Sequence, residues 1–148
     1  MMFLIKEGGF FILPLLACSI LMVAIIIERF FIYSAYMKRP LISYETPSEV
    51  VETLKKRLIM LNTIIMIAPL LGLLGTVTGL MKCFHLLGTE VTIYNPQQIS
   101  LGISEALLTT AVGLIITVIG LVFYNYFNSL LENYIYHYNL QLEEEKDE

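Results

Sequence analysis

A single carboxylate, that of Glu105, precedes a long stretch without formal charge, from Ala106 to Leu131. An ionised acid inside a membrane costs up to about 3 kcal/mol at the centre and less near the interface, so such acids usually serve a function. A carboxyl group at this place could take up and release protons, as a proton relay requires. The other interpretation is an interfacial residue in contact with water just above the span. The residue pattern alone leaves both interpretations open.

Threonine hydroxyls could also carry protons, because each can donate and accept a hydrogen bond. Most threonines in apolar helices instead bond a carbonyl of their own helix or fill a close contact. Thr76 and Thr110 remain candidates because each lies on a face of small residues, and antiparallel helices would let them meet at similar depth. His85 and His137 lack partners at metal-ligand spacing, and no phosphate-binding glycine loop occurs. No metal, cofactor or nucleotide is therefore expected.

Small residues recur at helical spacing in two apolar stretches, where they would let membrane helices approach closely. In the later stretch they form one continuous face, which we interpret as a helix interface or a pore wall. In the earlier stretch, Gly72 lies on one face of the helix, and Gly75 and Gly79 form a GxxxG pair on the adjacent face. The expected packing residues are Ala106, Gly113, Thr117 and Gly120 in the later stretch, and Gly72, Gly75 and Gly79 in the earlier one.

Three apolar stretches must position these side chains. The chain is 57% hydrophobic and 15% charged, with a mean hydropathy of +0.74. Residues 8–27, 58–81 and 106–131 carry no formal charge, and each run as a helix could cross a hydrocarbon core of about 30 Å. Too little chain remains for a separate soluble core, which excludes a soluble enzyme. We expect an all-α membrane protein with three transmembrane helices, the second and third extending into the cytoplasm.

We expect the whole chain, 1–148, to form one domain. The second long helix should begin at Thr46-Pro47-Ser48-Glu49, a capping box with proline at the first helical position, and the third near Pro96. The expected spans are about 10–32, 58–81 and 102–131, with connections at about 38–57 and 82–98 and a tail at 132–148.

The distribution of basic residues predicts the orientation in the membrane. The only basic residue between the second and third spans is Lys82. By the positive-inside rule, the N-terminus should be outside and the C-terminus cytoplasmic. Cys18 and Cys83 would then both lie near the outer side, where we favour free thiols over a disulfide. The basic cluster suits anionic lipid, and nothing suggests nucleic acid. The cluster between the first two spans comprises Arg29, Lys38, Arg39, Lys55, Lys56 and Arg57.

Two segments resemble the MotA/TolQ/ExbB proton-channel family: residues 68–79, APLLGLLGTVTG, and residues 102–114, GISEALLTTAVGL, followed by Tyr124-Asn125-Tyr126. The N-terminal Gly8-Gly9, Pro14 and Glu28-Arg29 are similar to the first span of the ExbB branch, whose short form has a similar size.

The resemblance implies a ring of five subunits around the single helices of an ExbD-like partner, in the bacterial inner membrane. Such a complex uses the proton gradient to energise a TonB-like protein and, through it, outer-membrane transport. Glu105, Thr110 and Thr76 match the family's acid and threonines and would line the central lumen, while an aspartate on the partner carries the proton.

The sequence is also compatible with other functions. Within the family the alternative is a TolQ-like subunit of the Tol-Pal envelope system. From other classes, a small proton-coupled transporter would also use one membrane glutamate, and a structural assembly subunit would use the same small-residue faces. A purely structural subunit would tolerate Glu105→Gln, whereas a channel subunit would lose activity with its fold intact.

Overall fold

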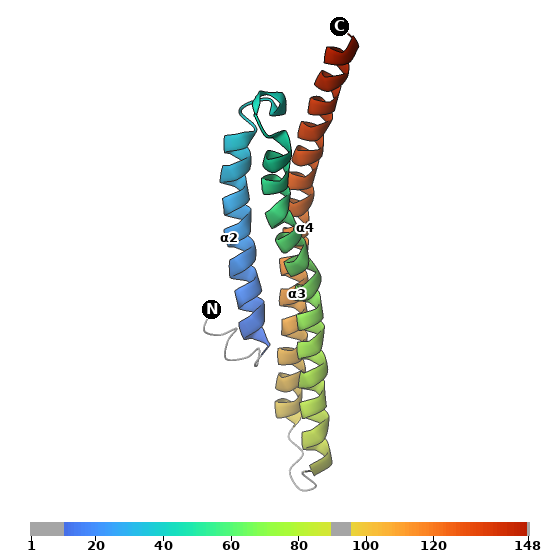
Figure 1. Cartoon of the computed structure of the whole chain (residues 1–148). Helices are drawn as coiled ribbons and strands as arrows, with labels where there is room; N and C mark the ends of the chain where they lie inside the picture. The colour runs from blue at the N-terminus through green and yellow to red at the C-terminus, as the bar shows by residue number, and fades with distance from the viewer. Residues whose placement is uncertain (1–10, 90–95, 148) are drawn as a thin grey trace. The chain divides into compact units, whose positions relative to one another are not determined.

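The computed structural model describes residues 11–89 and 96–147. In these ranges the chain forms three α-helices, α2 (Ile12–Tyr36), α3 (Pro47–Thr89) and α4 (Pro96–Asp147), and a short 3-10 helix, η1 (Leu41–Ser43) (Figure 1). The all-α prediction is confirmed, and all three α-helices are long and apolar enough to cross a membrane. In the most apolar window of each helix, only 22%, 39% and 28% of residues are buried inside the chain. Most apolar side chains therefore face outward, as lipid or neighbouring subunits would require.

The predicted helix starts lie where the sequence signals place them. Helix α3 begins at Pro47, and the Thr46 hydroxyl bonds the Glu49 carboxylate at 3.1 Å, so the two residues of the predicted capping box interact through their side chains. Helix α4 begins at Pro96, whereas the N-terminal glycines and the outer connection from 90 to 95 lie outside the described residues.

The chain divides into two compact units, and each α-helix contributes to both. Of the described residues, the first unit comprises 11–20, 64–89 and 96–119, and the second comprises 21–63 and 120–147. The candidate proton-pathway residues all belong to the first unit, whereas the basic cluster belongs to the second.

In the first unit, α3 and α4 pack against each other in opposite directions. Contact pairs show this, because Ala68 lies against Gly113, whereas Gly79, farther along α3, lies against Ala106, nearer the start of α4. The antiparallel arrangement that the pairing of Thr76 and Thr110 requires is therefore present.

In the second unit, one face of each helix forms the core. The first turns of α3 bury Val50, Leu54, Leu58 and Leu61, as their spacing predicts, while Val51 is half-buried. The α4 segment buries Phe127 and Leu131, and the Phe127 ring packs 5.1 Å from that of Tyr33 on α2. Farther along the face of α4 that carries Phe127 and Leu131, Tyr134 and Tyr138 are half-buried.

Candidate functional site

The hydroxyl groups of Thr76 on α3 and Thr110 on α4 hydrogen bond to each other. The Thr76 hydroxyl also lies 3.0 Å from the carbonyl oxygen of Ala106, and the Thr110 hydroxyl lies 3.0 Å from that of Gly72. Each hydroxyl has one proton to donate, so only some of these bonds exist at one time. In one arrangement Thr110 donates to Thr76, which donates to Ala106; in the other, Thr76 donates to Thr110, which donates to Gly72. This short hydrogen-bond chain can therefore run in either direction.

Thr109 extends this cluster, although its sequence position gave no reason to prefer it to other threonines. It is 2% exposed, and its hydroxyl lies 2.7 Å from the Ala106 carbonyl and 3.3 Å from the Gly72 carbonyl. The Gly72 carbonyl thus has three threonine hydroxyls within bonding distance, because Thr76 lies 3.3 Å from it as well. The only sequence signal is the Thr-Thr pair itself, both of whose hydroxyls lie within bonding distance of the Gly72 carbonyl.

Glu105 lies one residue before Ala106 on α4 and is half-buried. Its carboxylate makes no ion pair or hydrogen bond with the part of the chain that the structure describes, so the fold does not join it to the threonine pair. The carboxylate is thus available to water or to another chain. Its proton-carrying role stays a prediction.

Close backbone approach accounts for several of the predicted small residues. A Cβ added to Gly113 would lie 2.7 Å from the Ala68 carbonyl oxygen, and one added to Gly72 would lie 2.9 Å from that of Thr109. Both distances are shorter than a Cβ tolerates against backbone, so glycine is required for the helices to come this near.

The other members of the predicted small-residue set also lie at helix contacts or are buried. Gly75 faces the Thr109 side chain and Gly79 faces Ala106, while the Thr117 hydroxyl lies 3.3 Å from the Ile65 carbonyl on α3. Gly120 is buried in the second unit. These contacts are within one chain, and a role for the same residues in a ring interface stays a prediction.

The described residues contain no group of three His, Cys, Asp or Glu side chains arranged to hold a metal ion. Cys18 and Cys83 are both free thiols, as the sequence favoured.

Comparison with known proteins identifies the family. The family model described as the MotA/TolQ/ExbB proton channel family matches residues 41–139. The chain belongs to this family. It is 34% identical over 112 residues to the biopolymer transport protein ExbB of Aquifex aeolicus, an overlap of 76% of this chain and 73% of that protein. It is 36% identical over 107 residues to the ExbB of Helicobacter pylori, covering 72% of this chain and 71% of the relative.

A second branch of the MotA/TolQ/ExbB family also matches, over a shorter segment. The Tol-Pal system protein TolQ of Haemophilus influenzae is 36% identical over 77 residues, which is 51% of this chain and 32% of TolQ. No solved structure matches the chain. Family membership and three spanning-length apolar helices make this a membrane protein of the proton-channel family.

Proposed function

We propose that the chain is the proton-channel subunit of an inner-membrane complex that uses the proton motive force to energise TonB-dependent outer-membrane transport. The observation that carries the proposal is the reversible hydroxyl pair of Thr76 and Thr110 in the apolar helices of a MotA/TolQ/ExbB protein. Each hydroxyl can exchange one acceptor for another, as a relay group must. In the relay that we propose, water in the lumen delivers and removes the proton, because the backbone carbonyls at the two ends of the pair cannot pass it on. Glu105, unpaired within the described chain, would supply the exchangeable acid at the end of the span.

The assembly that we propose is a pentameric ring around an ExbD-like single-span protein, acting on a TonB-like protein. In it, Glu105, Thr76 and Thr110 line the lumen, and α3 and α4 extend into the cytoplasm. The outward-facing apolar side chains of all three helices supply surface for neighbouring subunits and lipid. Among relatives, the ExbB name occurs for proteins matched over most of the chain, which favours this branch.

The spans that we propose are about 10–32, 58–81 and 102–131. They place the N-terminus in the periplasm and the C-terminus in the cytoplasm, because the basic residues gather between the first two spans. Each proton that crosses 100 mV releases about 2.3 kcal/mol, so a few protons could drive one step of partner against ring.

A TolQ-like subunit of the Tol-Pal system is the second candidate, supported by the match to the Haemophilus protein over half of the chain. The two candidates differ in partner rather than in fold. Co-expression with an ExbD-like and a TolR-like protein, purification in mild detergent and native mass spectrometry would separate them. A pentamer that holds the ExbD-like protein supports the first, stable capture of the TolR-like protein supports the second, and a dimer without partner contradicts both.

Glu105→Gln tests the channel itself, because it keeps the size of the side chain and removes its exchangeable proton. We expect the variant to assemble normally and to lose proton-driven activity in cells that depend on this chain. The matched control is Glu52→Gln, an exposed carboxylate on α3 outside the apolar run, which should leave activity unchanged. Full activity of Glu105→Gln would contradict the channel proposal and favour a structural subunit.

A further inference from the structure

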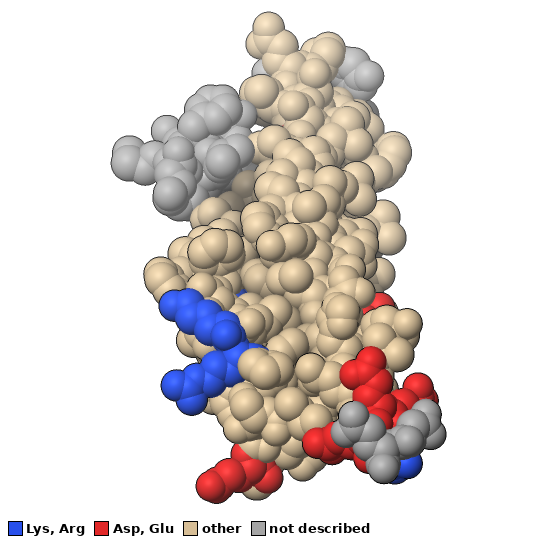
Figure 2. All heavy atoms as spheres, turned by 90° about the horizontal axis from the view of Figure 1, so that it is seen from above, with Lys and Arg blue, Asp and Glu red and all other residues tan. Residues whose placement is uncertain are grey.

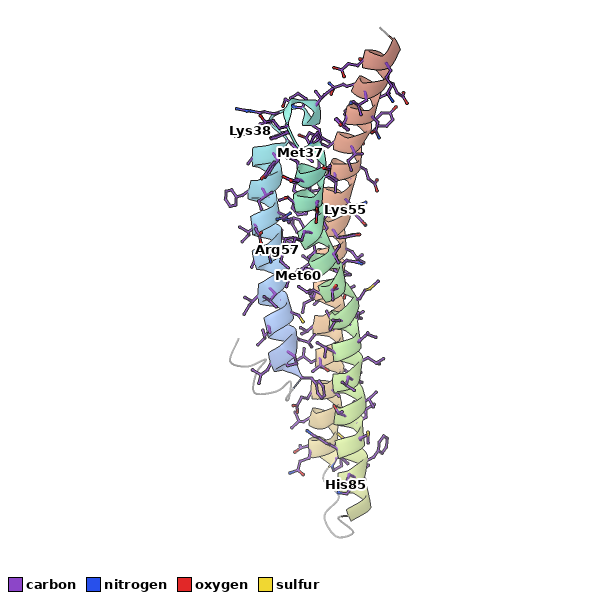
Figure 3. The ribbon with its side chains drawn as sticks, in the orientation of Figure 1. Met37, Lys38, Lys55, Arg57, Met60 and His85 are labelled. Carbon is purple, nitrogen blue, oxygen red and sulfur yellow. The ribbon has the colours of Figure 1, made fainter. Side chains whose placement is uncertain are left out.

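A pocket of about 480 Å³ lies between α2 and α3 in the second unit, apart from the candidate proton pathway. Its lining combines basic side chains, one carboxylate, one threonine and two apolar residues. Figure 3 shows Arg57 and Met60, two of these residues, on the side of α3 that faces α2. The lining residues are Glu28, Arg29, Ile32, Thr53, Lys56, Arg57 and Met60.

Arg29 is fixed in the wall of this pocket. It is 2% exposed, and its Nη1 donates to the carbonyl oxygens of Thr53 at 2.9 Å and Leu54 at 3.3 Å. Its Nη2 donates to Glu28 at 3.2 Å, and its buried Nε has no acceptor. A buried cation normally has a full set of acceptors, so this one is incompletely satisfied by the chain.

Positive charge also exceeds negative charge in the pocket. The Glu28 carboxylate serves two cations, because Arg57 Nε lies 3.5 Å from the oxygen that Arg29 bonds. Lys56 makes no ion pair with any described residue. Arg57 is 46% exposed, so its side chain is free to move from Glu28 to another anion. Over the whole face seen in Figure 2, Lys and Arg side chains gather at the left, and Asp and Glu side chains lie mostly at the bottom and the lower right.

The sequence places this pocket where two apolar runs reach their ends. On α2 the uncharged run stops at Ile27, directly before Glu28, and on α3 it starts at Leu58, directly after Arg57. Charged residues at the ends of spanning stretches lie at the level of the lipid headgroups. Met60, inside the apolar run of α3, supplies apolar surface on the membrane side of the charges, so the charged wall suits a phosphate and Met60 suits the hydrocarbon attached to it.

We propose that this pocket binds the phosphate of an anionic phospholipid headgroup. The phosphate oxygens accept charge-assisted hydrogen bonds from Arg57 and Lys56, and the preformed positive field of Arg29 holds the anion between α2 and α3. The acyl chains leave over Met60, toward the apolar run of α3. The site is separate from the proton pathway, and the proposal stands whether or not the chain conducts protons.

The test compares two double variants that remove the same charge. Lys56→Gln with Arg57→Gln alters the pocket, whereas Lys38→Gln with Lys55→Gln removes two exposed cations that do not line it. Arg29 is left intact because its buried bonds support the fold. The full-length protein is placed in nanodiscs of phosphatidylcholine with a small fraction of phosphatidylglycerol, and the phosphatidylglycerol retained after extraction is measured by native mass spectrometry.

We expect the pocket variant to bind phosphatidylglycerol about tenfold more weakly than the matched control. Both variants lose the same electrostatic attraction to an anionic lipid, but only the pocket variant also loses the hydrogen bonds from Lys56 and Arg57 to the phosphate. Equal weakening in the two variants would show attraction by net charge only and would overturn the proposal. A third arm adds inorganic phosphate to protein in phosphatidylcholine alone. If inorganic phosphate raises the Tm of the wild-type protein as much as phosphatidylglycerol does, the ligand is free phosphate, and the lipid assignment is wrong.

Discussion

The hydroxyls of Thr76 and Thr110, 34 residues apart in the chain, hydrogen bond to each other where α3 and α4 cross in the first unit. Because each also has a backbone carbonyl of the opposite helix within 3.0 Å, the pair joins two helices and offers two bond directions. The same two hydroxyls thus join the helices and form the proposed proton pathway, and substitutions can separate the structural role from the proposed one.

A double-mutant cycle on Thr76→Val and Thr110→Val measures the coupling between the two hydroxyls. Valine keeps the shape, so each single change should cost about 0.5–1.5 kcal/mol of unfolding free energy, and the double variant less than the sum. The measurement is SDS-induced unfolding followed by circular dichroism. Serine variants, which keep the hydroxyl, should retain proton-driven activity where the valine variants lose it.

The control is Thr78→Val, because among residues 11–89 and 96–147 the Thr78 hydroxyl bonds only the carbonyls of Leu74 and Gly75, both on its own helix. The Thr78→Val change should alter the unfolding free energy little, and the coupling energy between Thr78 and Thr110 should be near zero. Additive effects of Thr76→Val and Thr110→Val would show that the two hydroxyls act independently.

Gly113→Ala should weaken the contact between α3 and α4. The new Cβ would lie 2.7 Å from the Ala68 carbonyl oxygen, so one backbone must move, at a cost of about 1–3 kcal/mol. Gly88→Ala is the matched control, since a Cβ there meets nothing within 4 Å and alanine favours the helix by up to about 1 kcal/mol. Thermal unfolding in mild detergent distinguishes them, and equal Tm values would mean that the close approach at Gly113 is not maintained in solution.

The helix starts and the contact face between α3 and α4 follow largely from the sequence, because they depend on short local motifs and on residues repeated at helical spacing. Pro47 and Pro96 mark helix starts through a fixed backbone angle, and the small-residue spacing selects the face of α4 that meets α3. The partner carbonyls of the threonines, such as that of Gly72, do not follow from the sequence, since any of several registers would satisfy the same spacing.

Arg29 shows what local patterns leave out. It belongs to the basic cluster that the sequence assigns to anionic lipid, yet it is buried and bonds carbonyls of Thr53 and Leu54, which lie 24 and 25 residues away. Burial of an arginine depends on which face of a distant helix supplies acceptors, and no spacing within α2 encodes that.

Arg29→Met tests whether these buried bonds stabilise the second unit. Methionine has a similar length but no donors, so the variant should lose about 2 kcal/mol of unfolding free energy. The control is Arg39→Met, an exposed position where the change should be within about 0.5 kcal/mol. Both are measured by SDS-induced unfolding. An Arg29→Met protein more stable than wild type would mean that desolvation of the buried cation outweighs its hydrogen bonds.

Tyr134→Phe should loosen the end of α2 without unfolding the chain. The Tyr134 hydroxyl on α4 donates to the carbonyl of Arg39 at 2.7 Å and lies 3.3 Å from that of Tyr36, the last residue of α2. The last carbonyls of a helix have no partner within it, so an outside donor stabilises the helix end. Loss of this donor should cost about 1 kcal/mol and raise amide hydrogen exchange between residues 37 and 44.

The matched control is Tyr136→Phe on the same helix, because the Tyr136 side chain is 61% exposed and its hydroxyl bonds no group in the part of the chain that the structure describes. Its exchange pattern should equal that of the wild type. Both variants lose one phenolic hydroxyl from α4, so a difference confined to residues 37–44 isolates the bonds that Tyr134 makes at the end of α2. Unchanged exchange there in Tyr134→Phe would show that Tyr44, whose hydroxyl bonds the Tyr36 carbonyl at 3.0 Å, holds this helix end by itself.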